Sequence, residues 1–290
     1  MARWFRISRT RSLLLTLAAG ALGSGFAAGQ AAAAASAAFL PHQALYELNL
    51  VKSRGSASID SARGRILYNF SGSVCEGYTS EFRQVSELNS GEGKVTLSDL
   101  RSTSWEDGAG KSYRFKIDTR MNDTPSSPVD GVAERSGDHI TVKLKQPETK
   151  TFTLDGSTVF PTEQIRHIIA AAREGKSLLE LTVYDGSDNG EKVYNTLTVI
   201  GQPIPGDRTS TAPDPSTTND QMKSLTRWPV TVSYYDRDAR AKDGEQTPVY
   251  AMSFELFENG VSRALVLDYN DFVISGALGK FDVKDSKPCK

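Results

Sequence analysis

The sequence predicts a mainly β fold built as one domain, with one helix and one disulfide bond. Apolar and polar residues alternate along much of the 290-residue chain, which is the period of a half-buried β-strand. Asn-Gly and Asp-Gly pairs separate these runs, as hairpin turns would. Two cysteines, Cys75 and Cys289, enclose most of the chain after its N-terminal leader. Together these three observations predict the fold class.

Residues 1–37 are expected to be a cleaved signal peptide. Four arginines, with no acidic residue, precede an apolar run over residues 13–28, and small residues follow as far as Ala37. A membrane helix needs roughly 20 apolar residues, so this run is short for a stable span. The sequence therefore predicts Sec-type export and a periplasmic mature domain over residues 38–290. An uncleaved N-terminal anchor is the alternative.

The charge of the mature chain argues against some partners. Removal of residues 1–37 leaves 30 basic and 35 acidic residues, a formal net charge of −5 with both signs interspersed. Nucleic acids and anionic lipid headgroups attract strongly basic surfaces, so neither is expected as a general electrostatic partner. No segment after the leader is apolar enough to predict a membrane-spanning helix.

The two cysteines are expected to pair. An isolated pair in an exported protein is best explained by one disulfide, whereas redox pairs usually stand close together. The alternatives are two free thiols or a redox couple. The bond would place nearly the whole mature chain in one closed loop, which disfavours two independent domains joined by a free linker.

Thirteen segments show the alternation and composition of β-strands. Val, Ile, Thr and aromatic residues recur in them at every second position. Asn259-Gly260 lies between two such runs and is a strong hairpin signal. The predicted strands are residues 42–51, 65–70, 78–88, 93–105, 112–119, 139–145, 151–154, 178–184, 193–200, 228–235, 249–257, 261–269 and 272–283.

One segment has helical periodicity instead. Isoleucines and an alanine between residues 165 and 172 recur at the spacing of one helix face, which predicts a helix over residues 162–174 packed on the sheet. Thr162 is its predicted N-cap, and Gly175 suits the position just after its end. Residues 203–223 are rich in Pro, Thr, Ser and Asp, and are predicted to be a flexible loop.

The residues that resemble known catalytic or metal motifs do not complete them. Residues 108–112 are similar to the end of a phosphate-binding loop, but a strand pattern follows where that motif needs a helix, so a hairpin turn is predicted. Residues 236–244 contain three aspartates, but lack the ligand and glycine spacing of a calcium loop. No metal site and no cofactor is predicted.

The histidines and carboxylates point to no catalytic group either. His139 begins a predicted strand, His167 is expected to face solvent, and His42 is expected to make a structural hydrogen bond. No Gly-x-Ser-x-Gly motif accompanies them. The carboxylates Glu76 and Glu81 could serve a glycosidase, but solvated strand faces explain them as well. The sequence therefore favours a protein that is not an enzyme.

Short motifs follow one another along the mature chain in a characteristic order. They include Leu40-Pro41-His42, Cys75-Glu76-Gly77-Tyr78, Trp105-Glu106-Asp107-Gly108, Phe160-Pro161-Thr162-Glu163, Tyr184-Asp185-Gly186-Ser187, Trp228-Pro229-Val230, Asn259-Gly260-Val261 and Leu267-Asp268-Tyr269. In this order they resemble the EipB-type cell-envelope-integrity family of alphaproteobacteria. Gln164 and Asn270 depart from the pattern, which has histidine and glycine there. The resemblance covers nearly the whole mature chain and includes both cysteines.

The resemblance implies a more specific fold and role. The fold would be a long coiled antiparallel sheet, a half-open, barrel-like β-spiral that the two cysteines join. The role would be maintenance of the cell envelope under stress. The fold is similar to that of periplasmic lipoprotein carriers, which hold acyl chains in a half-open cavity, but fold similarity alone does not establish function.

Three hypotheses for function follow. The leading one is a non-enzymatic periplasmic protein that binds an envelope lipid or lipoprotein in a concave sheet lined by Tyr46, Tyr68, Phe70 and Phe115. The second is a scaffolding or interaction protein for envelope assembly, with exposed edge strands as docking sites. The third is an envelope hydrolase. The oligomeric state is not predicted.

Overall fold

The computed structural model describes residues 38–54, 59–90, 93–208, 210, 212–238, 246–285 and 289. These residues belong to one compact unit. The predicted signal peptide, residues 1–37, lies outside the described residues, and so does most of the 236–244 loop. No helix in the described ranges has the length and apolar character needed to span a membrane.

Fifteen strands form one antiparallel sheet, so the prediction of a mainly β, coiled antiparallel fold is confirmed. The strands are β1 (His42–Ser53), β2 (Ile59–Ser73), β3 (Gly77–Ser90), β4 (Lys94–Glu106), β5 (Ser112–Met121), β6 (Thr124–Pro125), β7 (Val129–Ser136), β8 (His139–Gln146), β9 (Lys150–Asp155), β10 (Leu178–Val183), β11 (Tyr194–Ile200), β12 (Arg227–Asp236), β13 (Tyr250–Phe257), β14 (Ser262–Asp268) and β15 (Phe272–Val283).

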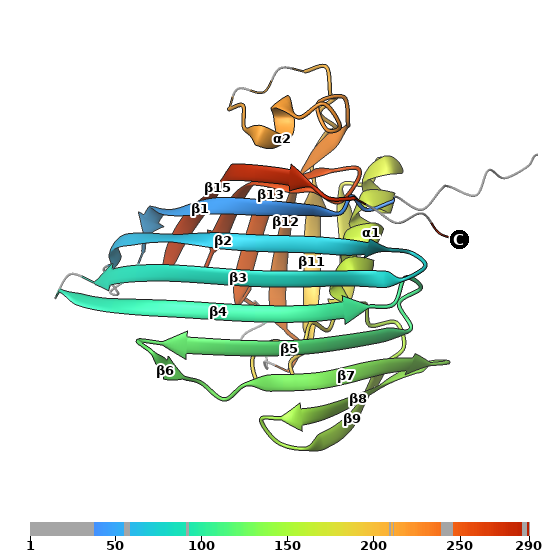
Figure 1. The fold of residues 1–290 in the computed structure, drawn as a ribbon. Helices are drawn as coiled ribbons and strands as arrows, with labels where there is room; N and C mark the ends of the chain where they lie inside the picture. Colours follow the sequence, from blue (N-terminus) through green and yellow to red (C-terminus); the bar gives the residue numbers. More distant parts are fainter. Residues whose placement is uncertain are drawn as a thin grey trace, which may run out of the picture. The chain divides into compact units, whose positions relative to one another are not determined.

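The sheet is a meander with one long-range pairing. Apart from β6, strands pair with the next strand along the chain from β1 to β9 and from β10 to β15, and β1 pairs with β15 to join the two series. The order is therefore β10 to β15, then β1 to β5 and β7 to β9, while β6 pairs only with β5. Figure 1 shows the long strands β1–β5 crossing in front of β11–β13, so the sheet curls over its own inner face.

The helix α1 (Pro161–Arg173) connects the two edges of this sheet. It follows β9, the last strand at one edge, and precedes β10, the strand at the other. Val159, just before the helix, forms an isolated parallel bridge with Val183 at the end of β10. The sheet is thus not closed by a full ladder, but the segment between β9 and α1 meets the β10 edge at this bridge.

The N-terminus of α1 differs from the prediction. The N-cap is Phe160 and the helix begins at Pro161, so the predicted N-cap Thr162 is wrong by two residues. Phe160 has no side-chain acceptor, and the carboxylate of Glu106 on β4 accepts the first helical N–H groups instead. At the other end Gly175 has φ +72°, which confirms its predicted position after the helix.

Two hydrophobic clusters form the interior. The first core cluster includes α1 and inward-facing residues of β1, β2 and β12–β15. It buries Ile168 and Ile169 of the predicted isoleucine face. The second core cluster is smaller and joins β5, β7, β8 and β9 to Phe160 before α1, Tyr184 after β10 and Val193 before β11.

Cys75 and Cys289 form the predicted disulfide, with their Cα atoms 5.8 Å apart. Cys75 lies in the turn between β2 and β3, beside the end of β4: Trp105 Nε1 donates a hydrogen bond of 3.1 Å to the carbonyl of Glu76. The bond therefore attaches the C-terminal segment to this turn.

The remaining differences from the predictions concern strands and loops. The strand β7 was not predicted, because its inward residues, Val129, Gly131 and Ala133, are small and follow a Pro-rich segment. The turn predicted at residues 108–112 is found between β4 and β5, at residues 107–111, and Ser112 already belongs to β5. The predicted flexible loop, residues 203–223, contains the short helix α2 (Pro215–Thr218) and the fully buried Met222, so part of it packs on the sheet.

Candidate functional site

The inner face of the curled sheet encloses a cavity of about 230 Å³. Inward-facing side chains of β1, β2, β3, β13 and β14 line it, together with Ile165 of α1. Most are apolar or aromatic, as the alternation of each strand requires for a buried face. They include Tyr46, Phe82, Tyr250, Met252 and Leu265.

A second, smaller cavity of about 130 Å³ adjoins the first. The two share Tyr68, Ile165 and Gly260 as walls. The smaller one has a more polar lining, with hydroxyl groups from β3, β4 and the start of α1. Its polar lining residues are His42, Tyr68, Ser80, Ser104, Thr162 and Asn259.

Strand register explains why these groups meet. Tyr46 of β1 is paired with Ile66 of β2, Tyr68 with Phe82, and Ser80 with Ser104, so alternate residues of four neighbouring strands point to the same inner face. Strands β13 and β14 contribute the other wall because the pairing of β1 with β15 brings the two ends of the sequence together.

The tyrosines of the larger cavity are neutral hydrogen-bonding groups. Burial raises the pKa of Tyr46 well above its ordinary value, although its hydroxyl donates a hydrogen bond of 2.8 Å to the carbonyl of Ser262. Burial also raises the pKa values of Tyr68 and Tyr250. Each ring thus offers the cavity an apolar face and a hydroxyl that remains protonated near pH 7.

The structure brings together three of the four predicted ligand-lining residues. Tyr46 and Tyr68 line the larger cavity, and Tyr68 and Phe70 line the smaller one. Phe115 lies apart from them, in the second core cluster, where its ring stacks at 5.3 Å on Tyr113. The alternation of β5 predicts which of its residues face inward, but not which residues they contact. Phe115 therefore has the same sequence signal as the three residues that do line the cavities.

Several lining residues were not predicted. Phe82, Tyr250, Met252 and Leu265 all fall in predicted strands, with the alternation of inward-facing positions. β3, which carries Phe82, pairs directly with β2. The strands of Tyr250, Met252 and Leu265 meet β1 and β2 only through the long-range pairing of β1 with β15, which leaves no local signal in the sequence.

Glu106 is a buried carboxylate at the edge of this region. Its two oxygens accept hydrogen bonds from the backbone N–H groups of Thr162 (2.7 Å) and Glu163 (2.8 Å). Burial raises the pKa of Glu106 to about 7, although these hydrogen bonds act in the opposite direction. Glu163 is in turn paired with Arg135 at 2.7 Å. The carboxylate therefore has a structural role, holding the N-terminus of α1 against β4.

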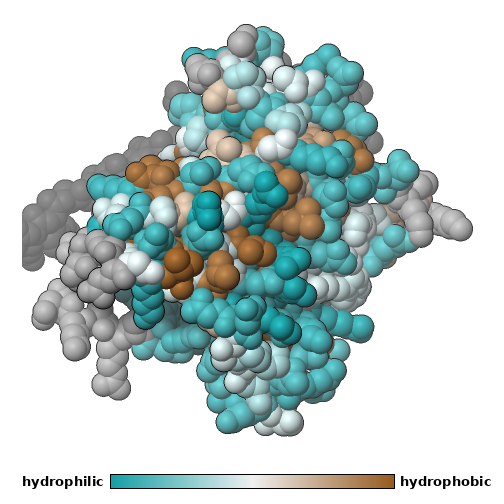
Figure 2. Space-filling view, turned by 60° about the vertical axis from the view of Figure 1, so that its left-hand side comes forward, coloured by the Kyte–Doolittle hydropathy of each residue, from teal (hydrophilic) through white to brown (hydrophobic). Residues whose placement is uncertain are grey.

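The end of the sheet that contains the β1–β2 and β3–β4 hairpin turns carries exposed apolar side chains. Val51, Val95, Met121 and Val249 lie at or beside strand ends there and are 42–60% exposed. Figure 2, which turns this end forward, shows apolar patches in the middle of a mostly hydrophilic face. Here Tyr269 packs at 5.1 Å on Tyr250, a residue that lines the larger cavity.

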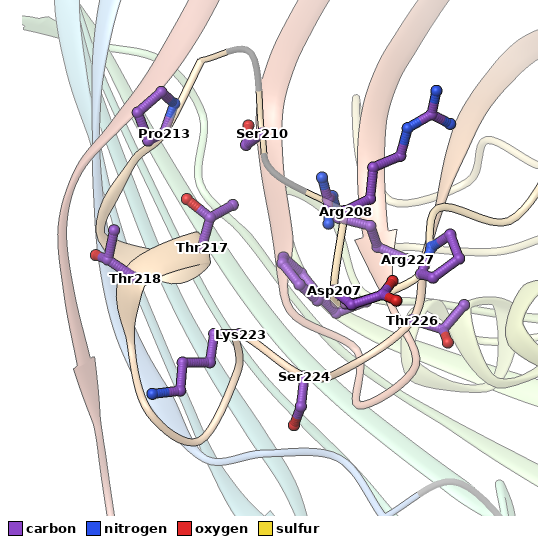
Figure 3. Close-up of a pocket in the computed structure, with 13 residues that line it drawn as sticks. Asp207, Arg208, Ser210, Pro213, Thr217, Thr218, Lys223, Ser224, Thr226 and Arg227 are labelled. Atoms are coloured by element: carbon purple, nitrogen blue, oxygen red, sulfur yellow. The ribbon is translucent and has the colours of Figure 1, made fainter.

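A wider cavity of about 740 Å³ lies beside α2, between residues 205–227 and Phe257 (Figure 3). It is lined by polar residues, including Arg208, Lys223 and Arg227. Arg227 is already paired with Glu255 at 2.6 Å, and Lys223 with Asp220 at 2.6 Å. Two of its cations are thus neutralised by the protein, and we regard the interior cavities as the better candidate site.

The described residues contain no cluster of three or more His, Cys, Asp or Glu that could hold a metal ion. Of the three histidines, His42 is buried with Nδ1 2.7 Å from the carbonyl of Leu40, His139 begins β8, and His167 is half exposed on α1. The proposed site therefore consists of apolar and uncharged polar groups.

Comparison with known proteins agrees with this fold. The EipB-like family model matches residues 33–285. A protein of Brucella abortus named cell envelope integrity protein EipB is 36% identical over 265 residues, covering 91% of this chain and 90% of that protein. A crystal structure from Brucella abortus, described as a β-barrel-like protein of a domain of unknown function, superposes with a TM-score of 0.76. It is 33% identical, and the match covers 85% of this chain and 99% of the other. The chain therefore belongs to the EipB-like family.

Proposed function

We propose that this chain is a non-enzymatic periplasmic protein that supports the integrity of the cell envelope by binding the hydrocarbon part of an envelope lipid or lipoprotein. The observation that carries the proposal is the pair of adjoining cavities on the inner face of the sheet. The name of the Brucella relative supports the envelope role, and the disulfide supports an oxidising compartment.

The lining suits a hydrocarbon chain. Apolar side chains such as Ile66, Met252 and Leu267 face aromatic rings across the larger cavity. Ligand sites are commonly concave and mostly apolar, with a few polar groups that set orientation. At about 230 Å³ the larger cavity is below the usual 300–1,000 Å³ of such sites, so it would hold one segment of a chain.

Cavity filling tests the proposal. The Met252→Trp variant places a large ring in the cavity, and we expect it to lower binding of a fluorescent fatty-acid probe by about tenfold. The control is Val266→Trp, at an exposed position on the outer face of β14. Thermal unfolding of both variants shows that each is folded.

Lipid extraction provides the second measurement. Mass spectrometry of organic extracts from the natively purified full chain should recover a bound lipid, in smaller amount from Met252→Trp than from Val266→Trp. Absence of bound lipid in repeated extracts, together with no probe binding on titration, would sink the proposal.

A further inference from the structure

We infer that the ligand carries a small, uncharged, hydrogen-bonding group, which lies in the 130 Å³ cavity while its hydrocarbon part occupies the 230 Å³ cavity. This inference rests on the proposed function and names the class of ligand: neutral amphiphiles such as monoacylglycerols. It follows from three properties of the smaller cavity, namely its polar groups, its charge and its size.

Polar groups from three elements converge on the smaller cavity. Ser80 of β3 and Ser104 of β4 are direct partners in the sheet, and Thr162 comes from the first turn of α1. Tyr68 belongs to both cavities, so its ring and its hydroxyl lie where an apolar chain would meet a polar end. Such an arrangement satisfies a hydroxyl or ester group that the apolar cavity would leave without partners.

His42 adds a hydrogen-bond acceptor. Its Nδ1 lies 2.7 Å from the carbonyl of Leu40, which can only accept, so Nδ1 carries the proton. Burial lowers the pKa of His42, which favours the neutral ring. In that tautomer Nε2 is an acceptor. A ligand hydroxyl could therefore donate to His42 and accept from a serine.

Charge excludes an anionic group. The described residues that line the smaller cavity include no Lys, Arg, Asp or Glu. Two charged groups lie nearby, and both are already engaged. Glu106 accepts from the N–H of the lining residue Thr162, and Arg166 donates to the carbonyl of Gly108 at 3.1 Å. A phosphate or carboxylate in this cavity would be desolvated beside Glu106, with no cation among the lining residues to pair with it.

Size limits the group further. A volume of about 130 Å³ holds only a few water-sized groups. A glycerol end fits this space, whereas a chain of sugars does not. The ligand end that agrees with all three properties is small, neutral and able both to donate and to accept hydrogen bonds.

A competition experiment on the full chain, purified after export with its disulfide intact, tests the inference. Monoacylglycerol, fatty acid and lysophosphatidylglycerol of one chain length compete with a bound pyrene-labelled alkane. We expect monoacylglycerol to bind at least about tenfold more tightly than either anionic lipid. Equal or tighter binding of an anionic lipid would overturn the inference.

Two double variants test whether the preference for a neutral headgroup comes from the smaller cavity. The double variant Ser80→Ala with Ser104→Ala should weaken monoacylglycerol binding about fivefold or more beyond any change in the affinity for the alkane probe. The matched control is Thr79→Ala with Thr103→Ala, at neighbouring positions on the outer face of the same strands. Unchanged monoacylglycerol affinity in the serine double variant refutes the inference.

The outcomes separate the two proposals. If neither the alkane probe nor any of the lipids binds, the proposed function fails, and the inference fails with it. If the probe and the lipids bind but show no headgroup preference, only the inference fails.

Discussion

The two core clusters of the sheet contain the same types of residue but differ in how tightly they pack. In the second cluster the aromatic rings contact one another: Tyr113 stacks on Phe160 at 5.2 Å, and Phe115 meets Tyr184 edge-on at 5.7 Å. The first cluster has ring contacts too, such as Phe70 stacked on Tyr78 at 5.5 Å, but its Tyr46, Tyr68 and Tyr250 also border the 230 Å³ cavity. Aromatic content alone therefore does not identify a ligand-binding surface.

Glycines account for part of the difference in packing between the two clusters. A Cβ placed on Gly186 would lie 2.4 Å from the Phe115 ring, and one on Gly131 would lie 2.6 Å from it. These glycines let backbone approach the ring from two sides, so no ligand fits between the ring and these two backbone segments. The comparison teaches that the second cluster is a structural core and that the first combines a core with a site.

Truncation of one phenylalanine in each cluster is expected to produce the largest contrast. Phe115→Ala removes a 3% exposed ring from close packing and should lower the free energy of unfolding by about 3–5 kcal/mol. Phe82→Ala removes a partly buried ring that already borders open space, and should cost about 1–2 kcal/mol. Urea denaturation measures both. Equal losses would contradict the difference in packing.

Removal of the disulfide should have the next largest effect. Cys75→Ala with Cys289→Ala releases a loop that spans most of the chain, and should lower the free energy of unfolding by about 2–4 kcal/mol. Hydrogen exchange should increase more in β2 and β3, beside Cys75, than in β8 of the second cluster. A uniform increase across both regions would show that the disulfide does not act locally.

The dependence of the free energy of unfolding on pH tests the role of Glu106, which lies at the boundary between the two clusters. Its pKa is about 7 in the folded protein against an ordinary 4.5, so the folded state binds a proton that the unfolded state has released between these values. This contribution to stability is complete below pH 4.5 and is lost as the pH rises through 7. Glu106→Gln should therefore reduce the loss of stability between pH 5 and 8 by about 1–3 kcal/mol.

Chemical denaturation at the two pH values measures this difference. Glu81→Gln, on the exposed face of β3, is the control. If Glu106→Gln and the unmodified protein lose equal stability between pH 5 and 8, the folded carboxyl does not titrate as described.

The smallest loss of stability is expected for a substitution on the outer face of the sheet, away from both clusters. The pKa of Asp99 is lowered to about 2 by hydrogen bonds from Arg83 and Arg101. Because these arginine side chains are half exposed, solvent screens the ion pairs, and Asp99→Asn should cost less than about 1 kcal/mol. Thermal unfolding checks this. A loss as large as that of Phe115→Ala would show that stability does not come mainly from the interior.

The sequence predicts secondary structure well where local patterns determine it. The alternation of residues 42–51 and the Asn259-Gly260 turn appear as β1 and the β13–β14 hairpin. Asn270, where the family pattern has glycine, has φ +68°, a conformation that asparagine tolerates. The strand β7 escapes prediction because small inward residues produce little hydrophobic contrast.

The site is harder to predict, because it depends on contacts between distant segments. Tyr46 and Tyr250 are 204 positions apart in the sequence and line one cavity only because β1 pairs with β15. Phe115 has the same local pattern as Tyr46 but lies beneath Gly131 and Gly186. The cap of α1 is likewise supplied by Glu106, more than fifty residues before the helix. Which inward-facing residues line a cavity, and which residue caps the helix, depend on the order of the strands in the sheet. The alternation of apolar and polar residues does not encode that order.

The bridge between Val159 and Val183 also bears on solubility. Edge strands present unpaired N–H and C=O groups that can recruit strands of other molecules and so begin aggregation. Here the N–H of Val159 donates to the carbonyl of Thr182 (2.8 Å), and the N–H of Tyr184 donates to the carbonyl of Val159 (3.0 Å). These bonds occupy the end of the β10 edge with the protein's own backbone. This short parallel contact therefore leaves fewer free backbone groups on the β10 edge for a strand of another molecule to pair with.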